Sequence, residues 1–107
     1  MTPKLMSYNT DDFQSKAHME MFIAEIEKNV DAMGDQMSDA GLLSFTVTQV
    51  WNKQGKSQLG WLFEYSDPDA YKKCQPIFKQ MEADFGDIEM QLTAYRGVVL
   101  EEHIAKD

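Results

Sequence analysis

The chain has few of the features that mark secreted or membrane proteins. It holds one cysteine, which excludes an internal disulfide and favours a reducing compartment. No stretch approaches the ~20 consecutive apolar residues of a membrane span. The opening residues MTPKLMSYNTDD lack the basic region and apolar run of a signal peptide. We therefore expect a cytoplasmic protein.

Positive charge is also scarce. The net charge is -8, the 10 basic residues are scattered among 18 acidic ones, and Arg96 is the single arginine. Binding to a phosphate backbone needs clustered basic side chains, so we expect no nucleic-acid partner. The two histidines, His18 and His103, belong to no cluster with metal-ligand spacing, and neither a P-loop nor a GxGxxG segment occurs. Metal and nucleotide chemistry are therefore not expected.

The chain does carry an aromatic pattern between residues 42 and 65. Apolar residues alternate with polar ones on either side of the polar loop 52–57, which is typical of two strands joined as a hairpin. The predicted apolar face holds Leu43, Phe45, Val47 and Trp51 on the first strand, and Leu59, Trp61, Phe63 and Tyr65 on the second. Such a face must be covered, and helices on either side of the hairpin are the available covers.

Two amphipathic helices are predicted. The first starts at residues 10–12, where Asp11 and Gln14 have capping-box spacing, and Gly41 ends it. The second starts at Asp67, with a proline at its first position, and runs to residues 85–86. Pro76 lies inside this second helix and is expected to kink it or divide it in two.

Two further strands complete the predicted order. Residues 4–9 form a short first strand, and alternation from Ile88 to Tyr95 gives a last strand that runs into Arg96. The order strand, helix, strand, strand, helix, strand predicts one α+β domain over residues 1–107, a ferredoxin-like βαββαβ fold with both helices on one face of an antiparallel sheet. The other sheet face would carry Leu42, Val50, Leu62 and Tyr95, so we expect a homodimer paired through that face.

The element order, and the passage WLFEYSDPDAY from Trp61 to Tyr71 in which a strand enters a capped helix, resemble the dimeric α/β-barrel superfamily. This superfamily includes antibiotic-biosynthesis-type and heme-degrading monooxygenases. The resemblance implies a pocket between sheet and helices in each subunit, and ordinary core packing is the alternative for each residue. The residues placed there are Phe22, Ile26, Phe45, Trp61, Phe63, Tyr65, Tyr71, Phe78 and Met81.

The chemistry of that superfamily matches this chain only in part. Heme-degrading members carry an axial histidine on the second helix, and residues 68–85 contain none, so no heme or other cofactor is expected. Cofactor-free members surround a phenolic substrate with Asn, Trp, Tyr and Arg. Trp61, Tyr65 or Tyr71, and Arg96 would form a similar set. His18, beside the apolar stripe of the first helix, is a further candidate for carrying a proton.

Arg96 continues the inward-facing row of the last strand, where it would bind a ligand carboxylate through two hydrogen bonds. The alternative is an exposed arginine, or one paired with Glu64 or Glu102. Cys74 lies within the apolar stripe of the second helix and is expected to be buried and inert.

Three classes of function remain open. The first is a module that binds a small apolar molecule with an acidic head, such as a fatty acid or a phenolic acid. The second is a cofactor-independent monooxygenase acting on a phenolic or quinone-type substrate. The third is a structural dimer whose interior is filled by its own side chains.

Overall fold

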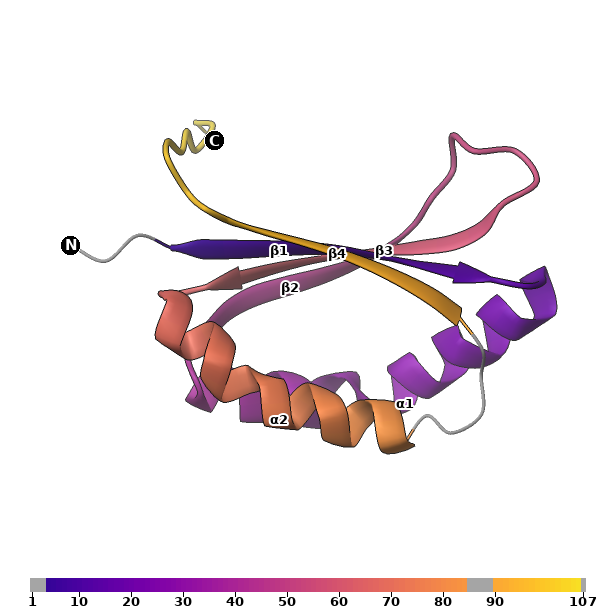
Figure 1. The fold of residues 1–107 in the computed structure, drawn as a ribbon, viewed down its shortest axis with the longest axis horizontal. Helices are drawn as coiled ribbons and strands as arrows, with labels where there is room; N and C mark the ends of the chain where they lie inside the picture. The colour runs from indigo at the N-terminus through magenta and orange to yellow at the C-terminus, as the bar shows by residue number, and fades with distance from the viewer. Residues whose placement is uncertain (1–3, 85–89, 107) are drawn as a thin grey trace.

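The computed structural model describes residues 4–84 and 90–106, and its strands and helices follow the predicted order. The elements are β1 (Leu5–Phe13), α1 (Lys16–Asp39), β2 (Leu42–Gln49), β3 (Ser57–Tyr65), α2 (Pro68–Asp84) and β4 (Met90–Val98). The strands form one sheet in the order β2-β3-β1-β4, and all neighbours are antiparallel. Both helices lie on one side of this sheet (Figure 1). The ferredoxin-like fold is therefore confirmed.

The first helix begins later than predicted. Strand β1 continues through Asp11 to Phe13, and Ser15 is the N-cap of α1, its hydroxyl accepting a hydrogen bond from the backbone N–H of His18 at 3.2 Å. The expected capping box at residues 10–14 was wrong because β1 is a central strand whose backbone pairs with both β3 and β4. This two-sided pairing outweighs a local capping signal. Helix α1 ends where predicted, because Gly41 has a positive φ of 107° directly after the C-cap.

The second helix begins as its capping chemistry predicts. Asp67 Oδ1 accepts a hydrogen bond of 2.8 Å from the backbone N–H of Ala70, and Pro68 is the first helical residue. Pro76 lies inside α2, which is one continuous helix, so of the two predicted outcomes the division of the helix does not occur. The fully buried side chains Cys74 and Tyr65, from α2 and the strand before it, hold this segment against the core. The predicted helix end at residues 85–86 and the predicted strand start at Ile88 lie outside the described residues.

A bulge changes the predicted faces of β2. The register shifts between Leu42 and Ser44, so Leu42 is buried and Leu43 is exposed, the reverse of the predicted arrangement. An inserted residue exchanges the two faces of a strand from that point on. The alternation of the sequence alone does not show where such an inserted residue lies. Beyond the bulge, Phe45 and Val47 pair with Phe63 and Trp61, as the hairpin pattern requires.

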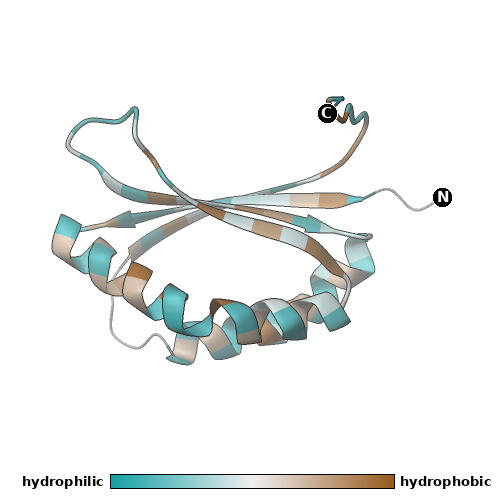
Figure 2. Ribbon diagram, turned by 180° about the vertical axis from the view of Figure 1, so that it is seen from behind, coloured by the Kyte–Doolittle hydropathy of each residue, from teal (hydrophilic) through white to brown (hydrophobic). Residues whose placement is uncertain are grey.

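The core lies between the sheet and the helices. Aromatic rings from β3 stack along the strand, with the ring centroids of Trp61 and Phe63 5.6 Å apart and those of Phe63 and Tyr65 6.2 Å apart. Helix α1 covers them with a buried stripe at intervals of three to seven residues: Met19, Phe22, Ile26, Met33 and Met37. Hydrophobic and hydrophilic residues alternate along the strand nearest the viewer in Figure 2. The predicted helix stripe and inner sheet face therefore meet.

The opposite face of the sheet is not covered by a helix. Tyr8 pairs in register with Leu62 on one side and Tyr95 on the other, and their exposed fractions are 48%, 38% and 66%. The β2–β3 loop and the segment after β4 extend on this side of the sheet (Figure 1). Both segments carry exposed apolar residues, since Trp51 lies in the loop, outside the strand face predicted for it, and Leu100 lies after β4.

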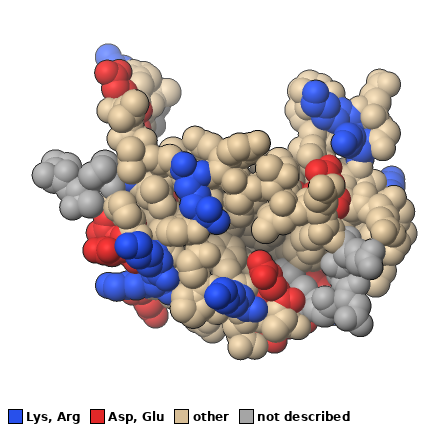
Figure 3. All heavy atoms as spheres, in the orientation of Figure 1, with Lys and Arg blue, Asp and Glu red and all other residues tan. Residues whose placement is uncertain are grey.

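The surface is mixed in charge. Lysine or arginine and acidic side chains lie near one another over the face shown in Figure 3, without a large patch of one sign. Among the residues that the structure describes, no helix is long and apolar enough to cross a membrane.

Candidate functional site

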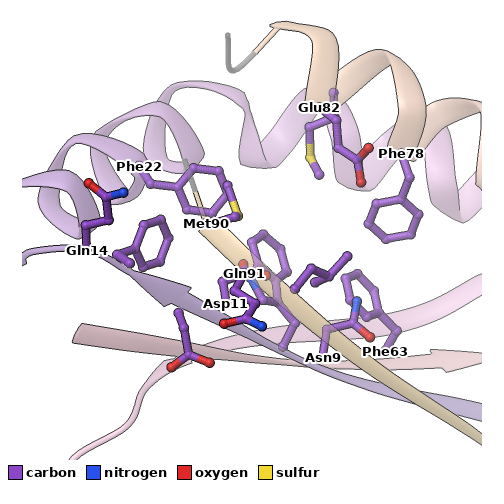
Figure 4. Close-up of a pocket in the computed structure, with 14 residues that line it drawn as sticks. Asn9, Asp11, Gln14, Phe22, Phe63, Phe78, Glu82, Met90 and Gln91 are labelled. Carbon is purple, nitrogen blue, oxygen red and sulfur yellow. The ribbon is translucent and has the colours of Figure 1, made fainter. Parts of the chain in front are cut away.

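A cavity of about 830 Å³ lies between the sheet and the helices, near the end of β1 and the start of β4. Figure 4 shows side chains from β1 and β4 on one side and from the two helices on the other. Its walls are mostly apolar, with polar groups gathered on β1 and at Glu82 and Gln91. The lining residues are Asn9, Asp11, Asp12, Phe13, Gln14, Phe22, Trp61, Phe63, Phe78, Met81, Glu82, Met90, Gln91 and Leu92.

The cavity takes in some of the predicted pocket residues. Phe22, Trp61, Phe63, Phe78 and Met81 line it. Ile26 is a buried core residue outside the lining, and Phe45 packs behind the cavity with its ring centroid 6.1 Å from that of Trp61.

The other predicted residues lie near the opposite end of β3. Tyr65 is fully buried, and Tyr71 packs edge-on against it with a centroid distance of 5.5 Å. The Arg96 guanidinium carbon lies 4.9 Å from the centroid of the Tyr71 ring. The sequence placed these groups in one pocket with Trp61. The fold instead separates them along the sheet.

Asp11 is the polar centre of the cavity. Asp11 is only 3% exposed, and its Oδ2 accepts a hydrogen bond of 2.9 Å from Trp61 Nε1. Burial in this apolar environment raises the pKa of Asp11 to about 6, because an apolar environment disfavours the charged form. The Trp61 hydrogen bond opposes this rise in pKa, while the negative charges of Glu82 and Asp12 add to it. A carboxyl group of this kind exchanges a proton close to neutral pH.

Asp11 is not among the predicted site residues, because its spacing to Gln14 indicated a helix cap. The signal that could have identified it is the alternation of Ser7, Asn9, Asp11 and Phe13, which continues the row that starts at Leu5. Ser7, Asp11 and Phe13 are all buried. A buried acid on the inner row of a central strand is costly unless it has a role or a partner, so it is a natural candidate.

Two further polar residues face the same space. Asn9 precedes Asp11 on the inner row, and its Oδ1 accepts a hydrogen bond of 3.1 Å from the Ser7 hydroxyl. This bond orients the amide, whose nitrogen can then donate to a ligand. Glu82 reaches from α2 toward the side of the cavity formed by β1 (Figure 4). The cavity thus presents carboxylate acceptors and an amide between aromatic walls.

Arg96 and Tyr65 form a second, separate polar region. Arg96 lies in register with the buried Ser7, on the helix side of the sheet. Arg96 is exposed, which is the first form of the predicted alternative, and the partners named in the second form are engaged elsewhere, since Glu102 pairs with Lys4 at 2.8 Å and Glu64 accepts a hydrogen bond from Ser44. Burial raises the pKa of Tyr65, with Cys74 and Tyr71 adding to the rise and Arg96 opposing it. Within the described part of the chain, the Tyr65 hydroxyl has no hydrogen-bond partner.

The remaining candidate residues lie away from the cavity. His18 Nδ1 is 2.6 Å from the Ser15 hydroxyl in the first turn of α1 and is not part of the lining. Cys74 is fully buried, its thiol donates to the Met37 carbonyl at 3.7 Å, and burial raises its pKa. No cluster of metal-ligating side chains occurs in residues 4–84 and 90–106.

Solved structures similar to this chain share its fold over nearly the whole length. Two dimeric ferredoxin-like proteins from uncultured marine organisms are 28% and 25% identical, with TM-scores of 0.78 and 0.85. The alignments cover 94% and 95% of this chain and 99% of each relative. SnoaB, a cofactor-independent oxygenase from Streptomyces nogalater, has a TM-score of 0.62 at 14% identity, over 99% of this chain and 100% of SnoaB. That likeness shows the fold alone.

Sequence comparison adds the family. None of the curated proteins matches this chain. The model of one family, described as a domain of unknown function (DUF6974), matches residues 2–99. Because this match spans nearly the whole sequence, the chain belongs to the DUF6974 family, a family of unknown function.

Proposed function

We propose that this protein binds a small, mainly aromatic molecule in the cavity, with a hydrogen-bond donor on the ligand directed at Asp11. The cavity itself carries this proposal. Its volume of about 830 Å³ lies within the usual range for ligand pockets, about 300 to 1,000 Å³. Aromatic walls with a few polar groups at one side are also typical of such pockets.

The polar groups favour a donor over the acidic head expected from Arg96. The lining contains Asp11, Asp12 and Glu82, and no lysine or arginine among the residues described there. A ligand carboxylate would face the carboxyl groups of Asp11 and Glu82, while the arginine that was expected to bind it lies over Tyr71. A hydroxyl or another donor would instead satisfy the buried Asp11 carboxylate.

A second candidate function is cofactor-independent oxygenation of a phenolic substrate. The observation that favours it is Asp11, a buried carboxyl with a pKa of about 6 beside an aromatic cavity, since a base of that kind can accept a phenolic proton near neutral pH. Oxygen consumption with phenolic compounds tests this candidate. Turnover that Asp11→Asn abolishes would support it, and turnover unchanged by that variant would count against it.

The binding proposal can be tested through the single cavity tryptophan. In a Trp51→Phe background, Trp61 provides the only indole N–H signal in a nitrogen–proton correlation spectrum. Titration with 2-naphthol, a flat two-ring donor, should shift that signal because Trp61 Nε1 is bonded to the carboxylate that the ligand would contact. No shift at the solubility limit of 2-naphthol would contradict the proposal.

A matched pair of variants locates the binding. Leu92 and Leu43 are 52% and 53% exposed, but only Leu92 lines the cavity. Leu92→Trp should therefore weaken 2-naphthol binding in calorimetry, because the larger side chain occupies ligand space, while Leu43→Trp should leave it unchanged. Equal losses in both variants would place the ligand elsewhere.

We further propose that two copies pair through the uncovered sheet face. The exposed row Leu62, Tyr8 and Tyr95 supports this pairing, as do the exposed apolar side chains of the two segments that extend on the same side. Two similar structures are themselves described as dimeric. Sedimentation should show a dimer that Tyr95→Glu dissociates and Met21→Glu, at a similarly exposed position on α1, does not. A monomeric wild-type protein would contradict the pairing.

A further inference from the structure

We propose that the cavity selects ligands bearing a protonated amine, so that the bound molecule is an aromatic ammonium compound whose cationic group lies between Asp11 and Glu82. This inference rests on the proposed function, because it requires that the cavity bind an aromatic molecule at all. It adds the charge of the ligand, which we infer from the acidic side chains that line the cavity.

Unbalanced negative charge is the first observation. Asp11 and Glu82 come from β1 and α2 and face the same space, with Glu82 extending toward the side of the cavity where Asp11 lies (Figure 4). Asp11 is buried whereas Glu82 is exposed, and a buried charge is normally paired with an opposite one because burial without a partner is costly. A ligand cation would supply the missing charge.

The missing positive charge is clearest at Asp11. The hydrogen bond found for its carboxylate among the described residues comes from a neutral donor, Trp61 Nε1, and reaches only Oδ2. Its register neighbours on both sides are leucines, Leu59 on β3 and Leu92 on β4. Neither leucine can donate a hydrogen bond or balance the charge. An ammonium group has three donors and a full positive charge, so it matches the open side of this carboxylate.

The aromatic walls are the second observation. The rings of Trp61 and Phe63 are nearly parallel, with an interplanar angle of 4°. Phe22 is tilted against Trp61 at 6.5 Å and against Phe13 at 5.3 Å. Aromatic faces carry negative charge density and attract ammonium groups within about 6 Å of the ring centre. Rings and carboxylates together therefore favour a cation, whereas rings alone would accept any apolar molecule.

The protein's own cations do not fill this role in the described residues. Arg96 lies four positions beyond Leu92 on β4, about 13 Å along the strand, and stacks on Tyr71. Three lysines are paired with glutamates outside the cavity: Lys4 with Glu102, Lys16 with Glu20, and Lys28 with Glu25. No lysine or arginine is among the described lining residues, so we assign the positive charge to the bound molecule.

Three naphthalene compounds of matched size separate charge from shape. The probes are 2-(2-naphthyl)ethylamine, 2-(2-naphthyl)ethanol and 2-naphthylacetic acid, measured by calorimetry at about pH 7.5, where the amine is protonated and the acid ionised. We expect the amine to bind at least about tenfold more tightly than the alcohol, and the acid to bind more weakly than both.

Variants assign that preference to the cavity. Asp11→Asn and Glu82→Gln should each remove most of the preference for amine over alcohol, because each deletes a carboxylate and keeps the side-chain size. Glu27→Gln, which removes an exposed acid on α1, controls for the net charge and should leave the preference intact. Leu92→Lys, which places a cation in register with Asp11, should reverse the order and favour the acid, whereas Leu43→Lys should not.

The outcomes distinguish this inference from the proposed function. Amine and alcohol binding equally well would overturn the choice of a cation and leave an aromatic-binding cavity in place. A preference that survives in both Asp11→Asn and Glu82→Gln would also overturn it, and Glu82→Gln keeps this test available if Asp11→Asn does not fold. Binding of none of the three compounds would overturn both the proposed function and this inference.

Discussion

Replacing Asp11 by asparagine should change how the stability of the protein depends on pH. The side chain keeps its size, and its amide oxygen can still accept the Trp61 hydrogen bond, but it no longer titrates. In the folded protein the pKa of Asp11 is about 6, against an ordinary value of 3.8. The folded state therefore holds the proton more tightly than the unfolded state.

The sign of the effect follows from that difference. Below about pH 4 the group is protonated in both states, and its preference for the folded state is fully present. As the pH rises through about 6, the folded state must hold a buried carboxylate, so the free energy of unfolding of the wild type falls. Each unit of pKa difference is worth about 1.4 kcal/mol, so the whole change amounts to about 3 kcal/mol. Asp11→Asn lacks this fall.

Urea unfolding followed by circular dichroism measures the prediction. Wild type and Asp11→Asn are compared at several values between about pH 4 and pH 7.5, at one ionic strength and one protein concentration. From the low to the high end of this pH range, the free energy of unfolding of the variant should rise relative to that of the wild type by up to about 3 kcal/mol. Glu27→Gln, on the exposed face of α1, controls for the loss of one negative charge and should show a much smaller trend.

Parallel curves for wild type and Asp11→Asn would refute the reasoning, because they would mean that the Asp11 carboxylate is as well solvated in the folded state as in the unfolded state. A variant that loses stability relative to the wild type as the pH rises would refute it as well. That result would require an unrecognised positive partner for the carboxylate in the free protein.

Three further predictions concern other contacts. Trp61→Phe should lower the free energy of unfolding more at about pH 7.5 than at about pH 4, by about 1–3 kcal/mol in urea titrations, because it removes the donor from an ionised buried carboxylate. An equal loss at both values would contradict this. Gly41→Ala should destabilise the protein by about 1–3 kcal/mol more than Gly55→Ala. Both glycines have a positive φ, but a Cβ at Gly41 would lie 2.5 Å from the Ala70 Cβ, whereas at Gly55 it would meet nothing within 4 Å. Similar melting temperatures of these two variants would show that the Ala70 contact is easily relieved. Arg96→Leu should change the affinity for cavity ligands by less than about twofold, because Arg96 lies on Tyr71, outside the cavity lining. A tenfold lower affinity of this variant for naphthalene acids, measured by calorimetry, would instead support a role for Arg96 in ligand binding.

Much of the fold could be predicted from local patterns. The hairpin follows from alternation around Phe45 and Trp61, and the start of α2 follows from the Asp67 cap and Pro68. These signals are local because side-chain period and capping depend on residues only a few positions apart. Predictions failed where contacts between residues distant in the sequence determined the local structure. Strand β1 runs on past the apparent cap at Asp11 because both its neighbours pair with it, and the bulge in β2 exchanges Leu42 and Leu43.

The site depended more heavily on tertiary structure. Local alternation was enough to predict that aromatic residues cover one face of the sheet, because Trp61 and Phe63 are two positions apart in a strand. Only the tertiary structure brings the Asp11 carboxylate within hydrogen-bond distance of Trp61 and places Glu82 of α2 at the same cavity. It also places the Arg96 guanidinium over the Tyr71 ring, outside the cavity lining. Strand register and helix packing join residues from distant parts of the chain, and no local pattern records which of them meet.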